Sequence, residues 1–318
     1  MTNTTGGTDG HGPSLSVVVV VYDMARELPR TLRSLSPAHQ QGISADDYEV
    51  VVVDNGSPEP LDDAMLAAFP GRLRAVRMEP AAPSPVRAAN HGLAQASGDL
   101  VGMMIDGARL ASPGLLATAR LATRLAERPV ITTPAWHLGP VTHMRAAEVG
   151  YDQTVEDELL AGSGWEADGY QLFALSTLSG SSGRGIFGPL GESNGLFMPR
   201  RQWDELGGYD ERFALPGGGL ANHDLYRRAC AAESAALIVV LGEGTFHQIH
   251  GGAATSRRFS WDDQHAEYEQ ITGRSHEPPQ NSPRYLGTMP GPLLPHVAHS
   301  TQLAIERLAR AGGAATGL

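Results

Sequence analysis

The chain has 318 residues, of which 41% are hydrophobic and 19% are charged, a composition typical of a folded globular protein and not of a disordered one. Its 24 basic and 35 acidic residues give a formal net charge of −11, which argues against nucleic acid or an anionic membrane as a partner. The only cysteine, Cys230, excludes a disulfide framework and fits a reducing cytoplasm.

The chain opens with a polar segment, "MTNTTGGTDGHGP", which predicts a disordered tail over residues 1–13. This segment has no basic residues, so it does not read as a signal peptide. The apolar run that follows, residues 15–22, is far shorter than the roughly 20 residues that a membrane helix needs. We therefore expect a cytoplasmic protein without an integral membrane segment.

Two valine-rich runs come next, "SLSVVVVVYD" and "YEVVVVDNGSPEP", and runs that are apolar on both faces predict interior strands of a parallel sheet. Leu28, Leu32 and Leu35 recur at helical spacing between them, which completes a β-α-β unit. Helices over 62–69 and 86–96 then alternate with strands over 74–79 and 100–105. The alternation predicts an α/β fold with a doubly wound sheet.

Polar residues stand at the ends of three of these strands: Tyr22, Asp54 and Asp106. Because ligands bind at the carboxyl ends of parallel strands, we expect these side chains to converge on one crevice. Asp54 can accept the imide N–H of a uracil, or it can cap the turn "DNGS" that follows it, and local chemistry leaves both open.

Asp106 is followed by Gly107 and Ala108, which leave room for a bulky anion or a hydrated ion. Mg²⁺ or Mn²⁺ is the simplest partner, because hard cations prefer oxygen and are often shared with a diphosphate. His247 and His250 follow a late strand and are candidates for further ligands to that metal. The alternative is that they are ordinary loop histidines.

The second half of the chain is less regular. A helix is predicted over 113–127, then a strand at "VITTPAW", and then irregular chain to residue 200 that forms either a mobile loop or a plain connection. A second helix begins near Asn222 and precedes the strand "SAALIVVLGEG". A proline-rich segment follows from 276, and an amphipathic stretch, 303–308, is expected to pack on the main body.

Five segments occur in a specific order: "SVVVVVYDMARELPRTLRSL", "EVVVVDNGSPEP", "RAANHGLAQASGDLVGMMIDGA", "NGLFMPRRQWDELGGYDERF" and "NHDLYRRA". Together they resemble a family 2 glycosyltransferase of the GT-A fold over roughly residues 15–255. The resemblance implies a mixed, mainly parallel doubly wound sheet flanked by helices, with a C-terminal extension. It divides the chain into a tail (1–13), a GT-A domain (14–275) with nucleotide-binding (14–135) and acceptor-binding (136–275) halves, and a proline-rich segment with a C-terminal helix (276–318).

The resemblance also implies roles for residues that bind the nucleotide. Tyr22 is similar in position to the tyrosine that stacks on the base, and Asp54 to the aspartate that contacts it. Arg87 matches an arginine that faces the nucleotide. Asp106 aligns with the first carboxylate of the family's Asp-x-Asp metal motif, whose last carboxylate is replaced here by Ala108.

Two further roles follow from the same resemblance. Related enzymes use a histidine after the late strand as a metal ligand, which implies His247 or, as the second choice, His250. Inverting members carry a Glu-Asp pair that supplies the catalytic base, and Asn222 occupies the place of its aspartate. Asn222 cannot accept a proton, so Asp224 is the nearest candidate base, with a plain helix cap as its alternative.

The sequence thus predicts a hexosyltransferase that moves a sugar from a nucleotide diphosphate sugar to a hydroxyl acceptor, a small molecule or a glycan. We expect an inverting, Mn²⁺- or Mg²⁺-assisted bacterial enzyme, and a homodimer is compatible with this prediction. A retaining enzyme and a degenerate, non-catalytic nucleotide-sugar-binding protein are the alternatives. A nucleotidyltransferase is disfavoured, because "YDMAREL" contains no glycine-rich basic loop.

Overall fold

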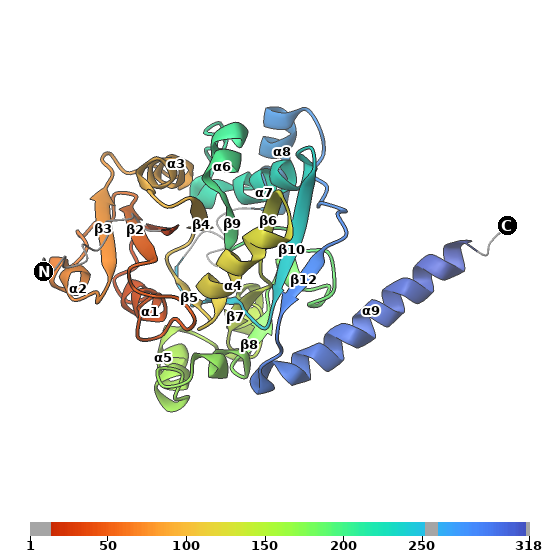
Figure 1. Cartoon of the computed structure of the whole chain (residues 1–318), viewed down its shortest axis with the longest axis horizontal. Helices are drawn as coiled ribbons and strands as arrows, with labels where there is room; N and C mark the ends of the chain where they lie inside the picture. Colours follow the sequence, from red (N-terminus) through yellow and green to blue (C-terminus); the bar gives the residue numbers. More distant parts are fainter. Residues whose placement is uncertain (1–13, 252–259, 316–318) are drawn as a thin grey trace, which may run out of the picture.

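The chain folds around two β-sheets, as the computed structural model shows for residues 14–251 and 260–315 (Figure 1). The predicted tail, 1–13, lies outside the described residues. The strands of the larger sheet lie in the order β12 (Arg284–Gly287), β10 (Ala235–Leu241), β6 (Arg128–Thr132), β9 (Leu196–Pro199), β4 (Leu100–Met104), β1 (Leu15–Val21), β2 (Tyr48–Asp54) and β3 (Arg72–Arg77). Those of the smaller sheet lie in the order β5 (Arg109–Ala111), β11 (Thr245–His247), β7 (Ala135–Leu138) and β8 (Ser176–Leu178).

Helices cover both faces of the larger sheet, and the alternation of side chains along its strands explains why. In β1, Val18 and Val20 pack in one core cluster, whereas Val17 and Val19 pack in another. The first cluster is closed by α3 (Val86–Gln95), α6 (Arg200–Leu206), α7 (Ala221–Ala231) and α8 (Trp261–Thr272). The second is closed by α1 (Leu28–Ser34), α2 (Asp63–Ala67) and α4 (Leu115–Ala122). A third cluster, around the smaller sheet, includes residues of α5 (Gln153–Gly162) and α9 (Leu294–Ala315). The predicted fold class, a mainly parallel sheet flanked by helices, is confirmed, with β9 as its antiparallel strand.

The close packing of the sheet makes Gly102 a sensitive position. A Cβ atom there would lie 2.3 Å from the Cε1 atom of Phe197, its fully buried cross-strand neighbour. We expect Gly102→Ala to lower the free energy of unfolding by about 1–3 kcal/mol, because overpacking forces the core apart. Gly162→Ala is the matched control, since a Cβ there meets nothing within 4 Å. Equal urea midpoints for the two variants would contradict this expectation.

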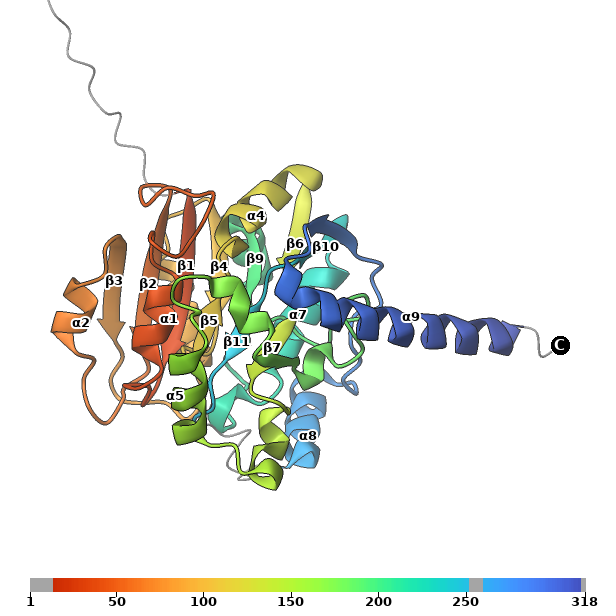
Figure 2. The ribbon, with the colours of Figure 1, turned by 90° about the horizontal axis from the view of Figure 1, so that it is seen from below.

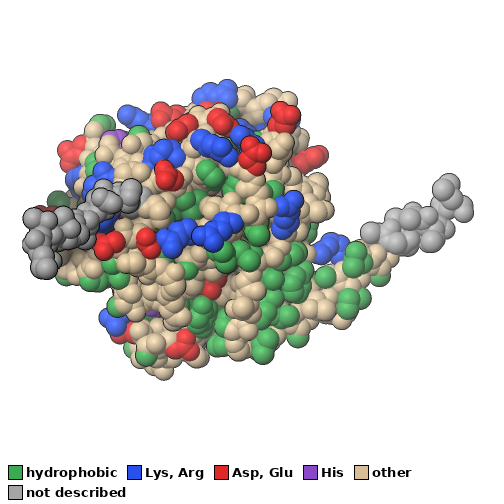
Figure 3. All heavy atoms as spheres, in the orientation of Figure 1, with side chains coloured by type: hydrophobic (Ala, Val, Ile, Leu, Met, Phe, Trp, Pro, Cys, Tyr) green, Lys and Arg blue, Asp and Glu red, His purple; other side chains and the backbone are tan. Residues whose placement is uncertain are grey.

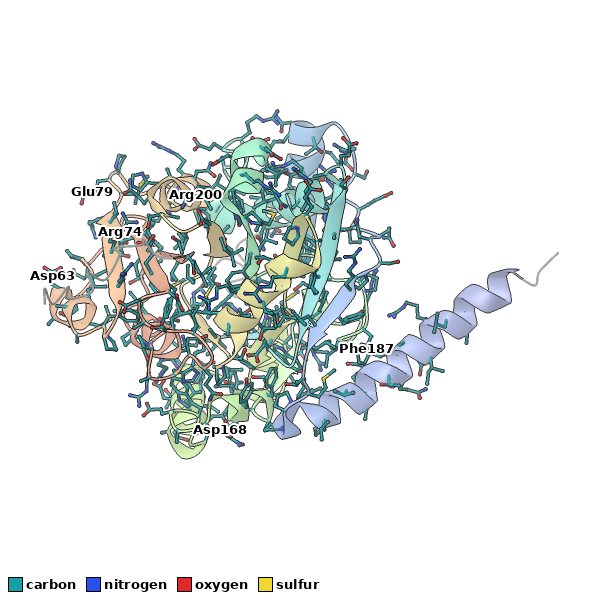
Figure 4. All side chains as sticks on the ribbon, in the orientation of Figure 1. Asp63, Arg74, Glu79, Asp168, Phe187 and Arg200 are labelled. Atoms are coloured by element: carbon teal, nitrogen blue, oxygen red, sulfur yellow. The ribbon has the colours of Figure 1, made fainter. Side chains whose placement is uncertain are left out.

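Helix α9 projects from the body of the molecule (Figure 2). It is anchored on one side, where Ser300 is fully buried and Arg307 donates a hydrogen bond of 2.9 Å to the carbonyl of Phe187, labelled beside α9 in Figure 4. Ile305 and Leu308, however, are 56% and 70% exposed. The expectation that 303–308 packs on the main body is therefore wrong for these two side chains, because the helix runs beyond the edge of the body.

The surface seen in Figure 3 mixes acidic and basic side chains, and hydrophobic side chains gather where α9 meets the body. Among the residues that the structure describes, no helix, α9 included, combines the length and the apolar content that crossing a bilayer requires. Cys230 is buried, as expected of an inert thiol.

Candidate active site

The carboxyl ends of the central parallel strands lie at one edge of the larger sheet. Val21 of β1 pairs with Asp54 of β2, and Val19 pairs with Met104 of β4. The residues that follow these strands therefore leave the sheet side by side. The N–H of Gly107 donates to the carbonyl of Val20 at 2.7 Å, which draws the chain after β4 across the end of β1.

Asp106 is surrounded by histidine nitrogens. Its Oδ1 accepts a hydrogen bond from the Ala108 N–H at 3.0 Å, and its Oδ2 lies 2.7 Å from His247 Nε2 and 3.5 Å from His250 Nε2. Although burial favours the neutral acid, the two histidines hold the pKa of Asp106 well below its usual value. The strand-end carboxylate and the late histidines, distant in the sequence, thus meet in one cluster.

The smaller sheet explains how His247 reaches Asp106. Strand β5, which begins three residues after Asp106, pairs antiparallel with β11, so that His247 stands opposite Arg109. Gly107 permits the tight passage from β4 to β5, because a Cβ atom there would lie 2.2 Å from Val21 Cγ1. The sequence did not predict β5 or β11 as strands.

Two more histidines, His137 and His143, lie beside His247, and the sequence analysis identified neither of them. His137 stands next to His247 in the register of β7 and β11, and the His137 and His143 rings stack with centroids 4.3 Å apart. The N–H of His143 donates to His137 Nδ1 at 2.8 Å. Burial lowers the pKa of His143 to about 3 and that of His247 to about 4, which makes these imidazoles neutral at physiological pH.

The Asp106 cluster suits a divalent cation. Asp106, His247 and His250 each offer a ligand atom, and these atoms lie within 4.8 Å of one another. One carboxylate oxygen with two imidazole nitrogens is a donor set that Mn²⁺ accepts. His137, His143 and His247 form a second group of the same compactness, with imidazole ligands only. The residues predicted as metal ligands are therefore brought together by the fold.

Arg109 adds a positive charge to this cluster, which the sequence analysis did not predict. It is 7% exposed, and its Nη2 lies 3.9 Å from Asp106 Oδ2. Its Nε and Nη1 atoms are buried without a hydrogen-bond partner. A guanidinium in this position gives the site a fixed charge that anionic groups near Asp106 would meet.

The predicted nucleotide-binding residues occupy the same edge of the sheet. Tyr22 is 48% exposed directly after β1. Asp54 is buried at the end of β2, where its Oδ1 accepts hydrogen bonds from the N–H and hydroxyl of Ser57 and its Oδ2 pairs with Arg77 at 2.7 Å. The turn-capping interpretation of Asp54 is thus realised in the structure. Arg87 is exposed in the first turn of α3.

Helix α7 carries the predicted catalytic residues. Asp224 is 3% exposed, and its two oxygens pair with Arg227 at 3.2 Å and with Arg228 at 2.6 Å. Asn222 donates from Nδ2 to a different carboxylate, Glu192, at 2.8 Å. The geometry argues against Asp224 as a proton acceptor, because both of its oxygens are occupied by guanidinium groups.

Comparison with known proteins agrees with this architecture. The family model described as "Glycosyl transferase family 2" matches residues 16–107, from β1 to just past Asp106. No curated protein sequence matches the chain.

Solved structures resemble the chain at low identity. TarS 1-349 of S. aureus in complex with UDP-GlcNAc is 15% identical, with a TM-score of 0.52, over 81% of this chain and 65% of that chain. The S. aureus TarS structure itself is 12% identical, with a TM-score of 0.50, over 81% of this chain and 42% of that one. The mannosyltransferase PcManGT from Pyrobaculum calidifontis, in complex with GDP-Man and Mn²⁺, is 17% identical, with a TM-score of 0.50, over 97% of this chain and 77% of that chain. At these identities the likeness shows the fold.

Proposed function

We propose that this chain is a family 2 glycosyltransferase of the GT-A fold, and that it moves a sugar from a nucleotide diphosphate sugar to a hydroxyl acceptor with the assistance of a divalent metal ion. The observation that carries the proposal is the distance of 2.7 Å between Asp106 Oδ2 and His247 Nε2 at the carboxyl edge of the parallel sheet. Nucleotide ligands bind at this edge in open α/β sheets.

The metal ion would be held by Asp106, His247 and His250, whose ligand atoms already converge. When bound, Mn²⁺ or Mg²⁺ would neutralise the negative charge that grows on the departing diphosphate. The missing second carboxylate at Ala108 is then compensated by imidazole ligands. Support for this assignment comes from PcManGT, which binds Mn²⁺ together with GDP-Man.

The nucleotide would lie over the ends of β1 and β2. Tyr22 offers an exposed aromatic face for the base, and Asp54 stands beside it, fixed by Ser57 and Arg77. Arg87 would face the nucleotide from the first turn of α3. These roles extend the family resemblance to individual residues.

Inversion at the anomeric carbon is the stereochemical outcome that we propose, with retention as the alternative. Asn222, in the place of the usual aspartate, is the observation that favours the alternative. Determining the anomeric configuration of the product by NMR separates the two. A non-catalytic donor-binding role is the third candidate, and release of nucleoside diphosphate by the purified protein would contradict it.

We expect nucleoside diphosphates to stabilise the protein only when Mn²⁺ is present. The test is a thermal-shift panel of UDP, GDP, dTDP and CDP with and without Mn²⁺. A ligand at 100 times its dissociation constant adds about 2.7 kcal/mol to the free energy of unfolding, and this raises the melting temperature by several degrees. Equal shifts with and without Mn²⁺ would contradict the metal assignment and leave the fold unaffected.

We further propose that the enzyme acts in the cytoplasm on a small-molecule or glycan acceptor, as a monomer or a homodimer. The hexosyl donor is the natural substrate class for this fold, and UDP- and GDP-linked sugars are the first to test because TarS and PcManGT bind UDP-GlcNAc and GDP-Man.

A further inference from the structure

The beginning of α7 is joined to the loop before β9 by Asn222. Its Nδ2 donates hydrogen bonds of 2.8 Å both to Oε2 of Glu192 and to the carbonyl of Ser193. Ser193 is fixed in turn by a hydrogen bond of 2.6 Å between its hydroxyl and that of Thr132 in β6. Asn222, whose amide cannot accept a proton, therefore holds the carboxylate of Glu192 in a defined position.

Glu192 contacts two residues in the first turn of α7, Asn222 and His223. Its Oε2 is 3.6 Å from Nδ1 of His223, and its side chain keeps 21% exposure. Arg109, whose Nη2 is 3.9 Å from Asp106, also acts on it electrostatically. One guanidinium thus links the charge of Glu192 to the proposed metal cluster.

Glu192 remains ionised at neutral pH. Burial favours the neutral acid, but His223, Asn222 and Arg109 together lower the pKa of Glu192 below its usual value. An ionised carboxylate with a solvent-exposed portion can accept a proton, whereas the oxygens of Asp224 are occupied by two arginines. Further ionisable groups that act electrostatically with Glu192 are Tyr209 and His276.

We propose that Glu192 is the general base of this enzyme, a carboxylate that replaces, from a separate loop, the aspartate missing at Asn222. The inference rests on the proposed function. Glu192 takes the proton of the acceptor hydroxyl while the acceptor oxygen forms a bond to the anomeric carbon. The bond from that carbon to the diphosphate oxygen breaks, its electron pair leaves with the nucleoside diphosphate, and Glu192 ends protonated.

The test uses release of nucleoside diphosphate from UDP-GlcNAc and GDP-mannose, with water as the acceptor. Glu192→Gln keeps the shape of the side chain and an oxygen for Asn222, so the fold is retained. We expect its kcat to fall about 10²–10⁴-fold with an unchanged KM for the donor. The limb of the kcat–pH profile that reports the base should disappear. Glu205→Gln is the matched control. Glu205 is exposed on the surface and pairs with Arg128, so this substitution should leave kcat unchanged.

A second variant separates catalysis from structure. Asn222→Asp in the Glu192→Gln background returns a carboxylate to the neighbouring position, and we expect kcat to recover at least tenfold over the single variant. A structural role for Glu192 would give no such recovery. Unchanged kcat in Glu192→Gln, or loss of kcat confined to Asp224→Asn, would overturn the proposal. Lack of turnover by the wild-type protein with either donor would contradict the proposed function itself, before any variant is compared.

Discussion

Replacing Asp106 by alanine is expected to lower nucleotide-sugar turnover about 10³-fold. The carboxylate is the only oxygen ligand of the proposed metal triad, and its loss would remove both the metal and the partner of His247 and His250. Charge stabilisation by a catalytic metal is worth several kcal/mol, and each 1.4 kcal/mol corresponds to about a tenfold change in rate. Steady-state release of nucleoside diphosphate measures the effect.

A matched control and a spectroscopic measurement distinguish a loss of turnover in Asp106→Ala from a folding defect. Glu205→Gln changes an exposed carboxylate whose ion-pair partner is Arg128, and it should keep wild-type turnover. Near-ultraviolet circular dichroism of Asp106→Ala reports whether the fold survives the loss of the contacts that Asp106 makes with Ala108, His247 and Arg109, and we expect the spectrum to match the wild type. Full activity in a folded Asp106→Ala protein would end the assignment of this carboxylate to the active site.

The largest loss of stability is expected from Arg26→Met. Arg26 joins the loop after β1 to α5, with contacts of 2.7 Å to Asp157 and 3.1 Å to the fully buried Glu156. It also pairs with Glu27 at 2.8 Å and donates to the carbonyl of Ile249 at 3.1 Å. Removing one partner of a buried ion pair leaves the other charge buried and unpaired. We therefore expect the free energy of unfolding, measured with urea, to fall by about 3 kcal/mol.

Arg33→Met is the matched control for Arg26→Met. Arg33 pairs with Glu166 at 2.8 Å, but both side chains are more than half exposed. Exposed ion pairs contribute little to stability, so the free energy of unfolding of the control should fall by less than about 1 kcal/mol. Equal losses in the two variants would show that the buried network does not stabilise α5.

The pH dependence of the Arg26 variant gives a second measurement. Burial already raises the pKa of Glu156 to about 7, even though Arg26 favours the charged form. Without Arg26 this pKa should rise further, so the folded variant would bind a proton that the unfolded chain has lost. The free energy of unfolding of the variant then falls as pH increases, and its difference from that of the wild type should widen above pH 7. A difference that narrows between pH 6 and 8.5 would contradict this account.

The main sheet and the edge at which its parallel strands end could be predicted from the sequence because their signals are local. Valine runs that are apolar on both faces indicate buried parallel strands, and Val18 and Val19 indeed face opposite cores. Asp106 and His247 were paired through the family resemblance, and their side chains do meet. Such signals need no knowledge of distant contacts.

The rest depends on contacts between segments far apart in the sequence. Strands β5 and β11 have three residues each, too few to show a period, and they form through pairing with distant segments: β11 pairs with β5 on one side and with β7 on the other. His137 and His143 carry no motif: His137 meets His247 through the pairing of β7 with β11, and His143 meets it through a ring contact from the 3₁₀ helix that follows β7. Glu192 lies in a glycine- and serine-rich stretch that resembles a plain loop, although Asn222 fixes it.

Isothermal titration calorimetry of UDP and GDP, with and without Mn²⁺, tests the metal-assisted donor site most directly. The wild-type protein should bind at least one of them about tenfold or more tightly when Mn²⁺ is present, a gain of at least about 1.4 kcal/mol. His247→Gln, which removes a proposed metal ligand and leaves Tyr22 and Asp54 in place, should lose that gain. Binding that is equally tight without Mn²⁺, or a Mn²⁺ effect that survives in His247→Gln, would contradict the account.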